Sequence, residues 1–304
     1  MPMARVLFSL LAALLALPSL ATDPAPRPPI YSIAFVRLKS SNLEKANAFY
    51  GKVLALRNSF SLRIIAIVQG APDSSGSLLD AIGFFVENLE QMHAYLTAQG
   101  VDCTVVRSKP GEVPPTVSAL NAQGTPGGYP FSLTVSDPEG HKLIFFEFPL
   151  EVGGPINPRE VSNRLIHAGF VVRNRAAMDR FYKDILGFHV YWHGGRKDDE
   201  TDWVDMQVPD GTDWIEYMLN VPPNADHRLL GVMNHIALGV PDIHAAEKQL
   251  RANGWNGDEQ PKIGRDGKWQ LNLYDPDQTR VELMEFTPTK EPCCSPYTGP
   301  HPKP

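Results

Sequence analysis

The chain has 304 residues, a net charge of −6 and a pI near 5.8. This acidic balance provides no basic surface, so we expect no nucleic-acid partner. Three cysteines, Cys103, Cys293 and Cys294, are too few for a disulfide framework. An oxidising compartment would permit one bridge from Cys103 to a cysteine of the tail.

The first 21 residues have the pattern of a signal peptide. A short basic start precedes the apolar residues 6–17, and Ser19 and Ala21 are small residues at the positions before a cleavage site. We therefore expect a mature chain that begins at Thr22, lies in the periplasm or is secreted, and has no membrane association after cleavage. An uncleaved anchor is the alternative. Residues 22–29 would form a stiff Pro-rich leader.

The rest of the chain repeats itself. Residues 42–56 match residues 174–188 at an offset of 132, and each segment is an amphipathic helix that an Asn opens after a strand. A second unit recurs at an offset of 154, in residues 81–100 and 235–254. A turn with its following strand recurs at an offset of 138, in residues 137–144 and 275–282. The sequence therefore predicts four units, paired in residues 30–150 and 160–287, followed by an irregular Pro-rich tail over 288–304 rather than a packed element.

Four residues of the second half have side chains that bind metals: His167, Glu216, His235 and Glu282. Each lies in a short apolar segment that is typical of a strand. Because strand side chains alternate between faces, the opposite face is apolar and fit for a core, while the face of each His holds small residues such as Gly169 and leaves room for a metal. Two imidazoles and two carboxylates suit a divalent transition ion. A lone His on a strand is usually structural, but four such residues at matching points of a repeat favour a metal site.

The first half keeps the repeat and lacks these residues. His167 aligns with Ser32, His235 with Ala81 and Glu282 with Ile144. Because the offset rises from 132 to 154, the first half lacks 22 residues between its two units. A counterpart of Glu216 would lie in this missing stretch. We interpret residues 30–150 as a degenerate scaffold without metal ligands.

Other residues carry weaker signals. Strand alternation makes four side chains candidates for a pocket lining, although ordinary packing explains them equally well: Trp203, Gln207, Trp214 and Met218. Residues 194–200 and 264–268 are expected to be solvated hairpin tips, whose Arg196 or Lys197 could meet an anionic substrate. Cys293 and Cys294 with His301 have metal-binding side chains, but a disulfide or an inert tail is the simpler interpretation.

The sequence resembles the vicinal oxygen chelate superfamily, which includes glyoxalase I, methylmalonyl-CoA epimerase, extradiol dioxygenases and antibiotic-resistance proteins. The segments IHAGFVV (166–172), NHIALGV (234–240) and DPDQTRVELMEF (275–286) carry the resemblance. The resemblance in fold covers residues 30–287, and the resemblance in the metal site covers residues 163–287. It implies an α+β fold of four βαβββ modules in two pairs, each pair forming a cupped mixed sheet with helices outside.

The order His-Glu-His-Glu is similar to glyoxalase I. The resemblance implies a metal-dependent lyase or isomerase that forms an enediolate from a small substrate with vicinal oxygens. One divalent ion (Zn, Ni, Co, Mn or Fe) would bind His167, Glu216, His235 and Glu282, and Glu216 or Glu282 would move the proton. An Fe(II) extradiol-type dioxygenase would use only His167, His235 and Glu282. Against it stand Glu216 and the absence of a His before the closing motif at Tyr274.

A non-enzymatic protein that binds a small molecule or confers resistance is the remaining alternative. A chain with four modules could complete its site alone, so both a monomer and a homodimer stay open.

Overall fold

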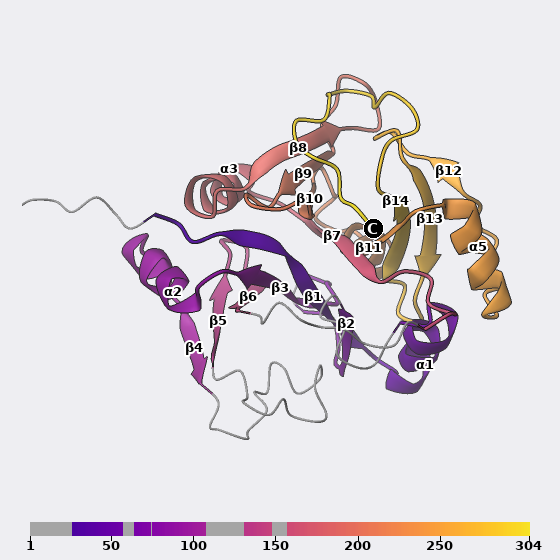
Figure 1. Cartoon of the computed structure of the whole chain (residues 1–304), viewed down its shortest axis with the longest axis horizontal. Coiled ribbons are helices and arrows are strands. Elements are labelled where there is room, and N and C mark those ends of the chain that lie inside the picture. Colours follow the sequence, from indigo (N-terminus) through magenta and orange to yellow (C-terminus); the bar gives the residue numbers. More distant parts are fainter. Residues whose placement is uncertain (1–25, 57–63, 74, 108–130, 148–156) are drawn as a thin grey trace, which may run out of the picture.

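A computed structural model describes residues 26–56, 64–73, 75–107, 131–147 and 157–304. The expected signal peptide lies outside these residues. Two curled mixed sheets of six and eight strands form the molecule, with helices on their outer sides (Figure 1). This confirms the predicted α+β fold. No helix in the described ranges combines the length and hydrophobicity that a membrane span requires.

The second half forms the eight-stranded sheet, in the order β12-β13-β14-β11-β7-β10-β9-β8. In each of its two modules the first and last strands pair in parallel, and the two first strands meet in the centre. The four central strands, β14-β11-β7-β10, are therefore those that carry the four candidate ligands. The elements are β7 (Arg164–Val171), α3 (Arg175–Asp179), η2 (Arg180–Ile185), β8 (His189–Gly194), β9 (Trp203–Gln207), β10 (Trp214–Met218), α4 (His227–Met233), β11 (His235–Val240), α5 (Ile243–Ala252), β12 (Lys262–Ile263), β13 (Trp269–Tyr274) and β14 (Arg280–Glu285).

The first half forms the six-stranded sheet, in the order β2-β1-β3-β6-β5-β4. Strand β2 pairs in parallel with β1, as β10 does with β7, so β2 is the last strand of its module. In the described residues this module has no counterparts of β8 and β9, which accounts for the 22-residue difference in the repeat. The elements are β1 (Ile30–Ser40), α1 (Leu43–Ala48), η1 (Phe49–Val53), β2 (Ile64–Gln69), β3 (Leu79–Val86), α2 (Leu89–Ala98), β4 (Thr104–Arg107), β5 (Phe131–Ser136) and β6 (Lys142–Phe146).

The module helices begin where the sequence places a short polar side chain. Asn42, Asn88, Asn174 and Asp242 each accept a hydrogen bond from the backbone N–H three residues later. Such a cap stabilises a helix by about 1 kcal/mol. Helices α1 and α3 then continue as the π-helical turns η1 and η2.

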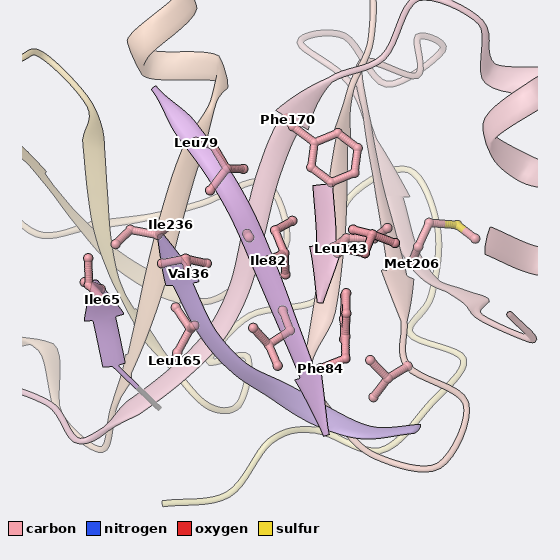
Figure 2. Packing of buried hydrophobic residues seen from close by; sticks show 14 of the residues in the cluster. Val36, Ile65, Leu79, Ile82, Phe84, Leu143, Leu165, Phe170, Met206 and Ile236 are labelled. Atoms are coloured by element: carbon pink, nitrogen blue, oxygen red, sulfur yellow. The ribbon is translucent and has the colours of Figure 1, made fainter. Parts of the chain in front are cut away.

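The two sheets share one apolar core. Figure 2 shows Val36 and Ile82 of the first sheet beside Leu165, Phe170 and Ile236 of the second, and all five are buried. Phe170 and Ile236 show that the strand face opposite the candidate ligands is the core face, as the alternation predicts. Leu165 reaches the same core because the pairing of β7 with β11 shifts between His167 and Leu165.

Reciprocal hydrogen bonds join the two halves. The hydroxyl of Tyr50 donates to Asp275 at 2.9 Å, and its repeat counterpart Tyr182 donates to Asp137 at 3.1 Å. Both aspartates lie in the matching turns before the last strands. Each half therefore supplies a hydrogen-bond donor to a buried carboxyl of the other.

The tail over residues 288–304 has no helix or strand, but it is packed. The backbone N–H of Thr298 donates to Tyr191 O at 3.0 Å, and the side chain of Gln207 donates to Pro300 O at 2.9 Å. In Figure 1 the tail arches from the β12 side of the sheet to β8. The expectation of an unpacked tail is corrected: its prolines prevent a strand ladder, yet its remaining polar groups still bond to edge strand β8.

The disulfide joins the neighbours Cys293 and Cys294, whereas Cys103 is a free, half-buried thiol. The expected bridge from Cys103 to the tail is therefore wrong.

Candidate metal centre

The sheet register brings the four predicted residues together. Glu216 on β10 pairs with Gly169, which pairs with His235 on β11. His167 on β7 pairs with Ala237, which pairs with Glu282 on β14. The four side chains thus occupy two adjacent rows on one face of the sheet.

The reactive atoms of these side chains converge. The Nε2 atoms of His167 and His235 are 3.1 Å apart, and Glu216 Oε2 lies 2.9 Å from His235 Nε2. Glu282 Oε2 lies 3.8 Å from His167 Nε2 and 3.9 Å from His235 Nε2. His167, His235 and Glu282 each offer a ligand atom within 4.8 Å of the others. All four side chains are largely shielded from solvent.

Gly169 allows this convergence because it has no side chain. A Cβ atom at this position would lie 2.0 Å from Cε1 of His235. The space beside His167 that the small residue Gly169 leaves open is therefore occupied by the imidazole of His235, a side chain that can bind a metal.

The environment of both imidazoles favours the neutral form, which has a nitrogen lone pair. Burial is the first cause that holds the pKa of His167 and of His235 well below the usual value. Nδ1 of His235 lies 3.1 Å from Met233 O, a contact that fixes the proton on Nδ1 and leaves Nε2 free to bind a cation. The ring of His167 packs on Trp214 with centroids 4.8 Å apart.

The carboxyl groups of Glu216 and Glu282 are buried with too little positive charge nearby to keep both ionised. Burial raises the pKa of Glu216 and of Glu282 to about 7, although Arg280, with a nitrogen 3.7 Å from Glu282 Oε2, acts in the opposite direction. A divalent cation would supply the missing charge, and two nitrogen and two oxygen donors suit such an ion. The residues fit one divalent metal, and this donor set is compatible with Zn, Ni, Co, Mn or Fe.

A cavity of about 490 Å³ lies over the centre. Trp203, Trp214 and Met218 line it, as the sequence suggests, whereas Gln207 is buried and bonds to Thr212 O and Pro300 O. Its walls combine tryptophans with cationic and acidic side chains: Trp192, Trp203 and Trp214; Arg196, Lys262, Arg265 and Arg280; Asp205, Glu216, Asp266 and Glu282. Such walls favour a small polar substrate with a planar part.

Sequence reasoning missed two charged residues near the centre. Asp205 pairs with Glu216 across β9 and β10, and burial, followed by the charge of Glu216, raises its pKa. The alternation of β9 could have revealed it. Lys268 is fully buried, with Nζ 3.3 Å from the hydroxyl of Tyr191 and 4.6 Å from the ring centre of Trp214. Residues 264–268 are therefore not entirely a solvated tip.

In the first half, hydrocarbon occupies the equivalent positions. Phe35 pairs with Gly83 as His167 pairs with Ala237, so Phe35 and not Ser32 is the counterpart of His167. The alignment with Ser32 is wrong because the offset of 132 that relates the two helices already places His167 opposite Phe35. Phe35, Ala81 and Ile144 form an apolar cluster with their neighbours.

A model of the Glyoxalase/Bleomycin resistance protein/Dioxygenase superfamily matches residues 164–283. The C-terminal half is a domain of this superfamily. All four candidate ligands lie within the matched residues of the superfamily domain. A search of curated proteins gives no match.

The fold of the whole chain is similar to that of homoprotocatechuate 2,3-dioxygenases. The enzyme of Brevibacterium fuscum has 23% identity and a TM-score of 0.61 over 86% of this chain and 72% of that chain. The enzyme of Arthrobacter globiformis has 22% identity and a TM-score of 0.59 over 86% of this chain and 81% of that chain. These extradiol dioxygenases share the vicinal oxygen chelate fold, and the likeness extends that fold to both sheets of this chain.

Proposed function

We propose that this chain is a glyoxalase-like lyase or isomerase that binds one divalent metal ion through His167, Glu216, His235 and Glu282. Its substrate is a small molecule with two adjacent oxygens. The observation that carries the proposal is the position of Glu216, whose Oε2 lies 2.9 Å from His235 Nε2. A second carboxylate thereby joins the His–His–Glu set.

A bound divalent ion supplies Lewis-acid polarisation of a substrate oxygen. The two imidazoles would hold the ion, because burial disfavours their protonated form. Glu216 or Glu282 moves a proton at the carbon beside a substrate carbonyl, since the side chains of both residues line the cavity.

A second candidate function is that of an Fe(II) extradiol-type dioxygenase. It is favoured by the close set of His167, His235 and Glu282 and by the fold of the dioxygenases. It is disfavoured because the described residues that line the cavity include no histidine other than His167, so none is available for acid–base chemistry.

Substitutions separate these functions. His235→Ala removes a nitrogen donor, so metal and activity are expected to fall together. Glu216→Gln is informative: if Glu216 is the base, metal is retained and turnover falls roughly 10²–10⁴-fold. If it is mainly a ligand, metal and turnover fall together. A dioxygenase would keep iron and most of its oxygen-dependent turnover in this variant.

Metal content is measured by mass spectrometry after anaerobic purification. Proton transfer is followed as deuterium incorporation from D₂O into α-hydroxycarbonyl compounds, and oxygenase chemistry as O₂ uptake with catechols. Glu44→Gln, on the exposed surface of α1, is the matched control. Full metal retention in His235→Ala would refute the site. A purified chain without metal would favour the non-enzymatic binding protein.

A further inference from the structure

The disulfide of the tail lies against the wall of the metal cavity. The carbonyl of Cys293 accepts a hydrogen bond from Trp192 Nε1 at 3.1 Å, and the N–H of Cys293 donates to Arg265 O at 2.8 Å. Trp192 and Arg265 both line the cavity. The peptide groups of this cysteine are thus bonded directly to two residues of the wall.

One cysteine of the pair is exposed and lies beside an ion pair. Cys294 is exposed while Cys293 is half-buried, and an Arg265 nitrogen lies 3.6 Å from Cys294 Sγ. The same nitrogen bonds to the carboxylate of Asp198, which lies within 4.8 Å of both sulfurs. Thiolates are the species that attack disulfides, and a nearby guanidinium both attracts an incoming thiolate and stabilises the cysteine thiolate that forms.

We propose that Cys293 and Cys294 form a thiol–disulfide exchange site for low-molecular-weight thiols. A thiolate attacks Cys294 Sγ, the bond between the cysteines breaks, and Cys293 leaves as a thiolate that takes a proton from water. A second thiolate attacks the incoming sulfur of the mixed disulfide and releases Cys294. Two thiols lose two electrons and become a disulfide, and the cysteine pair gains them as a dithiol.

The state of the pair is coupled to the cavity wall through the backbone. Cys294 has a φ of 72°, a left-handed conformation that a non-glycine residue rarely adopts. Breaking the disulfide bond between Cys293 and Cys294 frees Cys294 to leave this conformation. The adjoining carbonyl of Cys293 then shifts relative to Trp192, and the tail loosens along β8.

The exchange is tested on the full chain with Cys103→Ser, which leaves Cys293 and Cys294 as the sole cysteines. The folded protein is treated with millimolar glutathione, trapped with iodoacetamide and analysed by peptide mass. We expect two alkyl groups on the peptide of Cys293 and Cys294, with an unchanged circular dichroism spectrum. A pair that reacts only after unfolding would overturn the proposal.

The cation has its own test. Arg265→Gln should slow reduction by up to roughly fivefold at low salt, the effect of one full unit charge about 4 Å away in water. The paired carboxylate of Asp198 offsets part of this charge, and the difference should shrink at high salt. Arg175→Gln, at a distant position on α3, is the control and should react at the parent rate. Equal rates for Arg265→Gln and the parent would refute the role of the guanidinium.

The coupling is measured by hydrogen exchange. In the reduced chain and in the Cys293→Ser, Cys294→Ser double variant, amides of residues 288–304 and β8 should exchange faster, while those of α2 should not change. Unchanged exchange in the tail would overturn the coupling. None of these measurements depends on a metal or on a substrate of the cavity.

Discussion

Gly169→Ala tests the metal centre without altering a candidate ligand. The new Cβ atom would lie 2.0 Å from Cε1, 2.4 Å from Nδ1 and 2.9 Å from Nε2 of His235. Non-bonded carbon atoms are at their best separation at about 3.5–4.0 Å, so the imidazole must move by roughly 1.5 Å. The backbone of Gly169 does not have a positive φ, so alanine introduces no conformational problem of its own.

The magnitude follows from the narrow tolerance of metal–ligand distances. A shift of this size far exceeds the roughly 0.2 Å by which such distances vary, so His235 is lost as a ligand. Because altering a partner of a ligand already costs 10–100-fold in affinity, we expect the metal dissociation constant to rise by more than about 100-fold. Crowding the core costs roughly 1–3 kcal/mol of folding free energy.

The assay is equilibrium dialysis at a fixed free Zn²⁺ concentration, with metal counted by mass spectrometry and folding followed by thermal denaturation. Gly51→Ala is the control, because a Cβ atom there meets nothing within 4 Å. A folded Gly169→Ala chain that binds one ion with parental affinity would refute the assignment of His235.

Three further predictions concern the whole chain. Burial holds the pKa of both glutamates of the centre at about 7 instead of 4.5, so the folded metal-free chain keeps protons that the unfolded chain has released. Its free energy of unfolding should therefore fall by roughly 0.5–1 kcal/mol per carboxyl as the pH rises from 6.5 to 7.5, and bound metal should remove this fall. The buried imidazoles act with the opposite sign and mainly below pH 6.5; urea unfolding that is flat over the window would contradict the argument. Tyr182→Phe leaves the buried carboxylate of Asp137 without this donor and should cost about 1–3 kcal/mol in urea unfolding; Tyr31→Phe, on an exposed side chain, should change stability by less than about 0.5 kcal/mol, and equal losses would argue against the interlock. Intact mass of exported protein should place the mature N-terminus at Thr22, and a chain that retains residues 6–17 would exclude cleavage there.

The positions of the four candidate ligands could be predicted because they depend on local pattern. Each of His167, Glu216, His235 and Glu282 lies in a short strand whose alternation fixes the face, and the repeat ties the strands to equivalent places. The caps at Asn42 and Asn174 are equally local.

The remaining features depend on pairing between distant segments. Nothing near Gly169 indicates that the ring of His235 fills its space, because that contact depends on the register of β7 with β11. Residues 288–304 have no periodicity, so their packing could not be inferred from alternation.

The reciprocal bonds of Tyr50 with Asp275 and Tyr182 with Asp137 bear on how such a chain can evolve. A duplicated gene usually frees one copy to drift or to be lost, but here each copy supplies buried donors and acceptors to the other. Selection can therefore change the chemistry of one half while both halves are kept for folding. The first half holds hydrocarbon at Phe35 and Ile144, where the second half holds His167 and Glu282, and it still supplies Tyr50 to a buried carboxyl of the other half.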